Sequence, residues 1–138
     1  NLESLVWSDG EKIVPIDCRV YAKAEDQQTK NDHARTMFTI AKERSFTPDL
    51  VMFDSWYASL ANLKQLRSQG WAWLCRLKSN RLVDPDNTGN RAVTELDIPE
   101  VGLQVHLKGY GFIKVFRTVS PHGDAQHWAT SKLELTFE

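Results

Sequence analysis

The pattern of apolar and polar positions predicts a β-hairpin at the start of the chain. Residues 2–7 and 14–21 are strand-like, and the Asp-Gly pair between them is a strong hairpin signal. Pro15 cannot donate a ladder hydrogen bond, so the second strand is predicted to lie at a sheet edge. One face of this strand is expected to hold Val14, Ile16, Cys18 and Val20.

Two amphipathic helices alternate with two apolar runs up to residue 80. Thr29 and Asp32 have the spacing of a capping box, which predicts the start of the first helix. The apolar stripe of that helix consists of Ala34, Met37, Phe38 and Ala41. A second helix is predicted from about Ser59 to a glycine at position 70. Residues 50–53 and 71–77 are apolar without alternation, which is typical of parallel strands covered on both faces.

From Arg81 onward the pattern changes to alternating strands and turns, and no further helix is predicted. Strands are expected at residues 103–107, 112–116 and 133–137. We therefore expect an α/β core over residues 1–80 and a β-rich insertion or extension over residues 81–138.

Composition adds little to this picture. The content of 41% hydrophobic and 25% charged residues is ordinary for a soluble globular protein, and the net charge of −1 leaves any basic surface local. No apolar run approaches the length of a membrane span. Cys18 and Cys75 fall in apolar runs and are interpreted as buried, reduced thiols of a cytoplasmic protein. The start at Asn1 and the end at Glu138 suggest a piece of a longer protein.

Asp54 is the strongest candidate for a functional carboxylate. It directly follows the apolar run 50–53, and ligands of open α/β sheets bind beyond the carboxyl ends of the strands. An Asp after a strand also commonly caps the next helix, because its short side chain accepts backbone N–H groups. The local pattern alone leaves both interpretations open. Trp56 is a candidate for an exposed aromatic side chain at the same place.

A basic cluster of Arg76, Lys78 and Arg81 follows the second apolar run. If the two apolar strands are parallel, this cluster lies at the same sheet edge as Asp54 and can hold backbone phosphates. The alternative interpretation is a solvated strand end without a ligand.

Two metal patterns are rejected. Residues 84–95 approach an EF-hand calcium loop, but they leave a strand, and Thr88 and Arg91 do not suit that pattern. A solvated hairpin loop is the better interpretation. The four histidines show no zinc spacing, and His33 is predicted to lie on a helix surface.

Taken together, these segments resemble the catalytic domain of a bacterial DDE transposase of the IS4/IS701 type. The matching segments are residues 5–10, 14–21, 29–31, 51–59, 76–81, 107–111 and 127–130. The resemblance implies an α/β fold with an RNase H-like mixed sheet and flanking helices. Its first strand would lie upstream of Asn1, between the strands at residues 2–7 and 50–53, and its last helix downstream of Glu138.

The resemblance also implies a set of site residues and partners. Two Asp and one Glu would hold two Mg²⁺ or Mn²⁺ ions, with Asp54 as the second Asp and the other two carboxylates outside this chain. DNA, as transposon ends and target, would contact Arg76, Lys78, Arg81, Trp56 and Tyr57. The full-length protein is expected to be a homodimer in the bacterial cytoplasm, associated with the nucleoid.

Two alternative functions remain open. A catalytically inactive DNA-binding or assembly remnant of a decayed mobile element would share the fold and the basic cluster. A small-molecule-binding α/β domain is permitted by the pattern, but the chain has no Gly-rich phosphate loop. Because two of the three carboxylates are missing, we expect this chain on its own to be inactive and to bind Mg²⁺ or Mn²⁺ weakly.

Overall fold

The computed structural model describes residues 2–20 and 28–136 of the chain. The first half contains β1 (Leu2–Ser8), β2 (Ile13–Val20), α2 (Lys30–Glu43), β3 (Val51–Phe53), the 3₁₀ turn η1 (Ser55–Tyr57), α3 (Leu60–Ser68) and β4 (Trp73–Leu77). The second half contains β5 (Leu82–Val83), β6 (Arg91–Ala92), the 3₁₀ turn η2 (Val93–Glu95), β7 (Leu103–Leu107), β8 (Gly111–Val119) and β9 (Ala125–Thr130). The predicted order of elements up to residue 80 is confirmed, except that Tyr21 lies outside the described residues.

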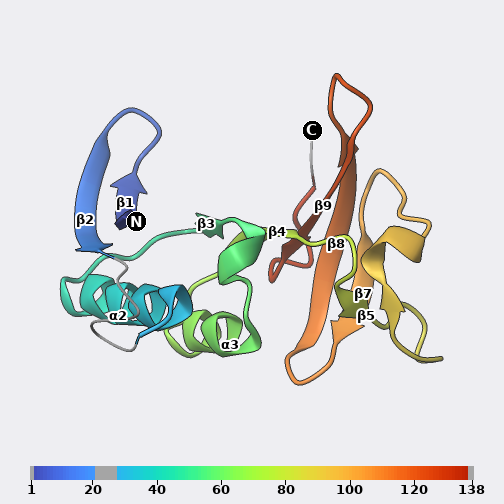
Figure 1. The fold of residues 1–138 in the computed structure, drawn as a ribbon, viewed down its shortest axis with the longest axis horizontal. Helices are drawn as coiled ribbons and strands as arrows, with labels where there is room; N and C mark the ends of the chain where they lie inside the picture. Colours follow the sequence, from blue (N-terminus) through green and yellow to red (C-terminus); the bar gives the residue numbers. More distant parts are fainter. Residues whose placement is uncertain (1, 21–27, 137–138) are drawn as a thin grey trace.

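A five-stranded mixed sheet forms the centre of the molecule, in the order β3-β4-β9-β8-β7 (Figure 1). β3 and β4 are parallel, with Val51 opposite Trp73 and Phe53 opposite Cys75, and the other pairs are antiparallel. The parallel arrangement of the two apolar runs is therefore confirmed. Since β9 pairs with β4, the sheet continues across residue 80, and the boundary of the insertion there stays a proposal.

The position predicted for the last strand is wrong. We expected it at residues 133–137, but β9 comes earlier, and residues 131–136 form bends and turns. β9 lies between β4 and β8, so it can bury polar residues that find partners inside the sheet. Thr130 is fully buried, and its hydroxyl donates a hydrogen bond of 2.7 Å to the Trp73 carbonyl. Burial, and secondly the charge of Arg117, lowers the pKa of His127.

Helix α2 begins at the predicted capping box. The Thr29 hydroxyl accepts the Asp32 N–H at 3.1 Å, and the Asp32 carboxylate accepts the Thr29 N–H at 2.8 Å. The N–H donation from Thr29 is the main reason why the pKa of Asp32 lies below its usual value. The predicted stripe is confirmed, because the buried apolar residues of α2 are Ala34, Met37, Phe38 and Ala41.

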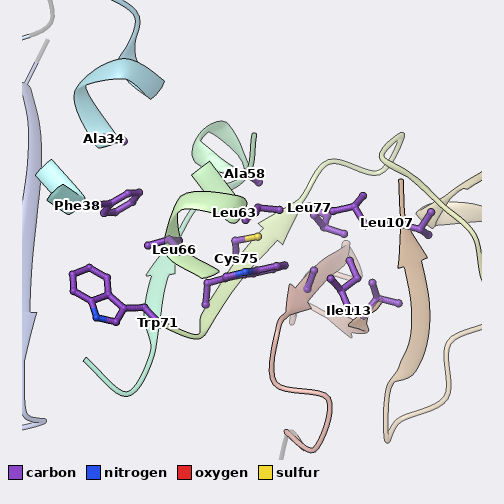
Figure 2. Packing of buried hydrophobic residues seen from close by; sticks show 14 of the residues in the cluster. Ala34, Phe38, Ala58, Leu63, Leu66, Trp71, Cys75, Leu77, Leu107 and Ile113 are labelled. Carbon is purple, nitrogen blue, oxygen red and sulfur yellow. The ribbon is translucent and has the colours of Figure 1, made fainter. Parts of the chain in front are cut away.

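The core fills the space between the helices and the sheet (Figure 2). Trp73 is fully buried, its indole N–H donates to the Tyr110 hydroxyl at 3.1 Å, and the two rings meet edge to face. Burial raises the pKa of the Cys75 thiol to about 12, which keeps it protonated and confirms the prediction of a buried thiol. The side chain of Cys18 lies outside the described residues.

Neither described helix has the length and apolar character of a membrane span.

The N-terminal strands form a separate hairpin, β1–β2, that packs on α2. Its turn is the predicted one, with the Asp9 carboxylate accepting the N–H groups of Glu11 and Lys12 at 2.8 Å. A register shift beside Leu5 and Val6 leaves Ile16 without a partner residue on β1. Ile16 is buried whereas Val14 is 40% exposed, so the strict alternation expected for β2 is interrupted by the bulge.

A groove with a volume of about 470 Å³ lies between the hairpin and β3. Phe38 and Ala41 of α2 contribute to its lining, and Met52 of β3 is 66% exposed beside it. Within the described part of the chain, β1 pairs only with β2 and β3 only with β4, so each has an unpaired edge. This is the place where the resemblance puts a strand from upstream of Asn1.

The loop between β5 and β6 is a hairpin loop, as expected, and not an EF-hand. The Asp84 carboxylate accepts the Asn87 N–H at 2.8 Å, and Asp86 forms an ion pair of 3.1 Å with Arg91. These carboxylates therefore stabilise the turn itself.

The position predicted for His33 is wrong, because this side chain is buried against β1 rather than exposed on a helix surface. The hairpin covers this side of α2 and brings Glu3, which is 3% exposed, to 3.9 Å from His33 Nδ1. Both carboxylate oxygens of Glu3 are buried, and neither has a hydrogen-bond partner among the residues that the structure describes. Burial raises the pKa of Glu3, while the nearby His33 and Lys30 act in the opposite direction.

Replacing Glu3 by Gln should raise the melting temperature at pH 7. A raised pKa in the folded state means that the penalty for the buried charge is fully present above that pKa and is relieved as the pH falls towards 4.5. The variant should therefore gain most stability at neutral pH and little near pH 4. Thermal melts across this range, compared with Glu11→Gln in the exposed turn, measure the difference. An equal gain at both pH values would contradict this account.

Candidate active site

Asp54 lies at the carboxyl end of β3, as predicted, and its side chain is exposed. Its Oδ1 accepts the backbone N–H of Trp56 at 2.8 Å and so caps η1. The capping interpretation is therefore correct, and it is compatible with a ligand role because the second oxygen, Oδ2, accepts no hydrogen bond from the described residues. One carboxylate oxygen therefore holds the turn, and among the described residues the other has no hydrogen-bond donor.

Lys78 is the exposed member of the basic cluster that lies beside the Trp56 ring of this turn. Because β3 and β4 are parallel, the residues after Leu77 reach the same sheet edge as Asp54. The Lys78 ammonium lies 5.6 Å from the centre of the Trp56 ring, and its side chain is exposed. The prediction that the end of this strand shares a sheet edge with Asp54 is confirmed, and a role of Lys78 in binding DNA stays a prediction.

Arg76 and Arg81 make contacts that sequence reasoning missed. The Arg76 guanidinium lies 5.7 Å from the Trp128 ring, its neighbour across the β4–β9 pair. Arg81 is half-buried, and its guanidinium donates to the Ala58 carbonyl at 2.8 Å. The Arg81 contact joins the segment after β4 to the residue before the N-cap of α3. The Arg76 side chain instead lies against Trp128 of β9.

Tyr57 is half-buried and lies between the hairpin and the Asp54 turn. Burial, and then the charges of Glu3 and Asp54, raise the pKa of its hydroxyl. The side chain therefore stays neutral at ordinary pH and can act as a hydrogen-bond donor beside Asp54.

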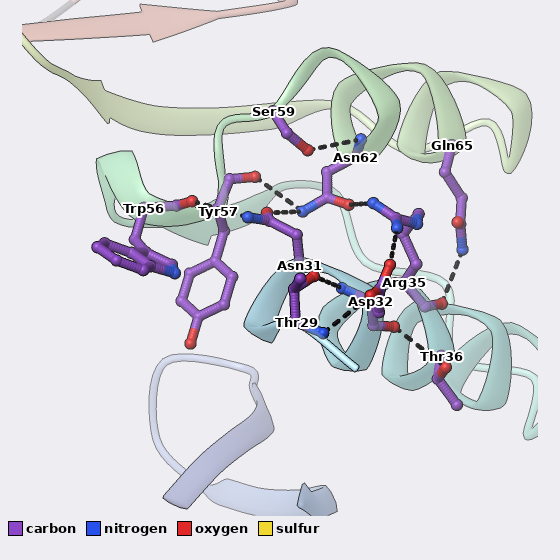
Figure 3. A network of polar contacts seen from close by, with 10 residues as sticks. All are labelled: Thr29, Asn31, Asp32, Arg35, Thr36, Trp56, Tyr57, Ser59, Asn62 and Gln65. Atoms are coloured by element: carbon purple, nitrogen blue, oxygen red, sulfur yellow. Dashed lines mark hydrogen bonds and ion pairs between the residues drawn. The ribbon is translucent and has the colours of Figure 1, made fainter. Parts of the chain in front are cut away.

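A polar network that the sequence did not reveal fixes the backbone after Asp54 (Figure 3). Asn62 of α3 is fully buried, and its amide donates to the Tyr57 carbonyl at 3.0 Å and to Asn31 at 2.7 Å. Asn31 in turn donates to the Trp56 carbonyl at 3.4 Å, and Arg35 donates to the Asn62 oxygen at 3.1 Å. The one signal in the sequence was Asn62, a polar residue next to Leu63 in the predicted second helix.

Replacing Asn62 by Ala should destabilise the protein by about 1–3 kcal/mol, because buried partners lose their hydrogen bonds. The loss should be local to the Trp56–Tyr57 turn, so hydrogen exchange of those amides should accelerate more than that of β8. Urea denaturation and amide exchange measure the two effects, with Gln104→Ala on the exposed face of β7 as the control. Unchanged exchange at the turn would contradict a positioning role.

A cavity of about 550 Å³ adjoins the turn on the side of Lys78. Polar and basic side chains lining it come from η1, from the segment after β4 and from two loops of the second half. They are Ser55, Ser59 (the N-cap of α3), Lys78, Asn80, Arg81, Asn90 and Lys108. The cavity beside η1 therefore combines cationic and amide side chains with apolar ones, which suits an anionic ligand that also has an apolar part.

Among the described residues, no group of three or more Asp, Glu, His or Cys side chains could hold a metal ion. Asp54 can supply one oxygen ligand, which is part of a single octahedral shell. The described residues therefore fit the role of one ligand and do not complete a metal site.

The model of the family described as transposase DDE domain matches residues 9–129, which is most of the chain. The chain belongs to the transposase DDE domain family. The mixed sheet with its two helices agrees with the RNase H-like fold of such domains. A comparison with curated proteins gave no match. The IS4/IS701 type stays a prediction.

Membership in this family makes DNA transposition the general function of the chain and DNA its substrate. Transposase DDE domains generally use divalent metal ions, which agrees with a carboxylate at the end of β3.

Proposed function

We propose that this DDE domain takes part in metal-dependent cleavage and transfer of DNA strands, with Asp54 as the second acidic metal ligand. The observation that supports it best is the position of Asp54 at the carboxyl end of β3, beside a cationic edge. A bound pair of Mg²⁺ or Mn²⁺ ions would supply stabilisation of the attacking and leaving oxygens of the phosphoryl transfer.

The residues of this chain have separate tasks in the proposed reaction. Asp54 offers Oδ2 as a ligand while Oδ1 keeps its hydrogen bond to the Trp56 N–H, so the carboxylate is oriented before any ligand binds. Lys78 attracts a DNA phosphate to the same edge, and Arg76 extends the positive charge along β4. Tyr57 and Arg81 support the turn from its buried side.

The proposal assigns the other two acidic ligands to residues outside this chain. A single carboxylate cannot fix two ions, so this chain alone should neither cleave DNA nor bind Mg²⁺ or Mn²⁺ tightly. We further propose that the complete protein is an IS4/IS701-type transposase that acts as a homodimer on DNA in the bacterial nucleoid.

A second candidate function is DNA binding without cleavage, as in a remnant of a mobile element. It is supported by one observation: Lys78, Arg81 and Lys108 line the cavity beside η1, whereas no group of three or more acidic, His or Cys side chains among the described residues could hold a metal ion. The two candidates differ in whether a protein with all three carboxylates cleaves DNA.

Replacing Lys78 by Ala should weaken binding to all DNA duplexes about equally. Lys78 is exposed at the sheet edge and is proposed to contact phosphates, whose neutralisation releases counterions independently of sequence. The slope of log K against log salt should decrease by about one. Fluorescence anisotropy at several salt concentrations measures both quantities.

The matched control is Lys64→Ala, which removes an exposed lysine from the surface of α3. It should leave the affinity and the salt slope unchanged. A loss in Lys78→Ala that is confined to one DNA sequence would show base recognition instead. An unchanged slope would remove Lys78 from the proposed interface.

A further inference from the structure

Trp56 presents an exposed indole between two cationic side chains. Its side chain is 55% exposed, and the ammonium groups of Lys30 and Lys78 lie 5.2 and 5.6 Å from the ring centre. Lys30 belongs to the first turn of α2, whereas Lys78 follows β4. Two distant segments therefore place positive charge around the same aromatic ring.

The backbone of Trp56 is held on both sides of the residue. Asp54 accepts its N–H at 2.8 Å, and the Asn31 amide donates to its carbonyl at 3.4 Å. Asn31 is itself held by the buried Asn62. In Figure 3 the indole points away from this network. Since the turn is fixed before any ligand arrives, stacking on this ring costs little additional ordering of the protein.

The ring also lines the cavity of about 550 Å³ next to Asp54. This volume lies in the range of pockets that hold small organic groups. Ser55, Asn80 and Asn90 contribute groups that can donate and accept hydrogen bonds. An exposed aromatic face beside a groove with cationic side chains is the combination that binds single-stranded nucleic acid.

We propose that Trp56 stacks an unpaired base of single-stranded DNA, with Lys30 and Lys78 on the phosphates that flank it. The inference rests on the proposed function for the identity of the ligand as DNA. It adds that the DNA at this edge is locally unpaired. Bases inside a duplex stack on their neighbours and do not offer a free face to the indole, whereas an unpaired base does.

An acidic polypeptide is the main competing ligand, because it would also suit the two lysines. It has no aromatic face for the exposed ring, and its carboxylates gain nothing from the indole. The side-chain amides around the cavity match the edges of a base better than a row of carboxylates, which only accept hydrogen bonds.

The test compares short single-stranded DNA with a blunt duplex of the same sequence by fluorescence anisotropy. Trp56→Ala should weaken binding of the single strand by about 5- to 150-fold, the range for loss of one stacked base. Its duplex binding should be unchanged, and Trp56→Phe should restore most of the single-strand affinity. Phe112→Ala, which removes another exposed aromatic residue, should change neither. Circular dichroism establishes that each variant is folded.

Three results would overturn the inference. These are an equal loss for single strand and duplex, no loss for either, and competition by poly-glutamate as effective as that by single-stranded DNA. Failure of the proposed function is distinguishable, because it concerns cleavage and Asp54. If Asp54→Asn still cleaves DNA while Trp56→Ala loses the single strand, the function fails and the inference stands. The reverse pair of results overturns the inference alone.

Discussion

Asp54→Asn should lower the rate of DNA cleavage by at least about 100-fold in a transposase that carries this domain with all three carboxylates. A loss of this size is typical when one group that stabilises transition-state charge is removed. Asparagine retains an oxygen that can accept the Trp56 N–H, so the cap of η1 is kept. It lacks the negative charge that a divalent cation requires. Nicking of a labelled transposon end with Mg²⁺ or Mn²⁺ measures the rate, and anisotropy measures DNA binding, which should be largely retained.

The control for Asp54→Asn is Asp9→Asn in the β1–β2 turn. Asp9 also accepts backbone N–H groups, from Glu11 and Lys12, but lies on the hairpin turn. Its replacement should leave cleavage unchanged. Cleavage that persists in Asp54→Asn would exclude this carboxylate as a metal ligand. A wild-type protein that binds DNA but never cleaves it, with all three carboxylates present, would establish the binding-only alternative.

Trp73→Ala should remove about 3–5 kcal/mol of folding free energy, the cost of truncating a large buried aromatic residue. Trp73 has no exposed surface, packs against Phe53 and Tyr110, and donates its indole N–H to the Tyr110 hydroxyl. Since domains are stable by only about 5–15 kcal/mol, the variant should be close to unfolding at room temperature. Urea denaturation followed by fluorescence measures the change.

Trp56→Ala is the matched control, because it removes the same side chain from an exposed position. Its effect on the free energy of unfolding should stay within about 0.5 kcal/mol. Trp73→Phe should fall between the two, since it keeps a ring in the core but leaves the Tyr110 hydroxyl without its donor. Equal destabilisation by both alanine variants would contradict the assignment of Trp73 to the core and Trp56 to the surface.

The elements that were predicted correctly depend on residues close together in the chain. The capping box of Thr29 and Asp32, the Asp9 turn and the stripe of α2 each rest on interactions within a few positions. The uninterrupted apolar runs before Asp54 and Lys78 likewise predicted two parallel strands, which is correct. The expected cover on both faces is wrong for β3, because Met52 is 66% exposed at its unpaired edge. Parallel strands end at the same edge, so the placement of Asp54 and Lys78 at one edge of the sheet also followed from the sequence.

The contacts of these side chains depend on the tertiary structure and could not be predicted from the local pattern. Arg81 looked like Lys78 in the sequence, but the start of α3 offers the Ala58 carbonyl to its guanidinium, so its charge is engaged within the fold. His33 was placed on a helix surface because the packing of β1 over α2 is not encoded in the helical period. β9 was missed because two neighbouring strands bury its polar residues. Asn62 was missed because its side-chain amide donates to Asn31 at the start of α2, a residue 31 positions away in the chain. Contacts between segments distant in the chain leave no local period, and they set burial, partners and charge at this site.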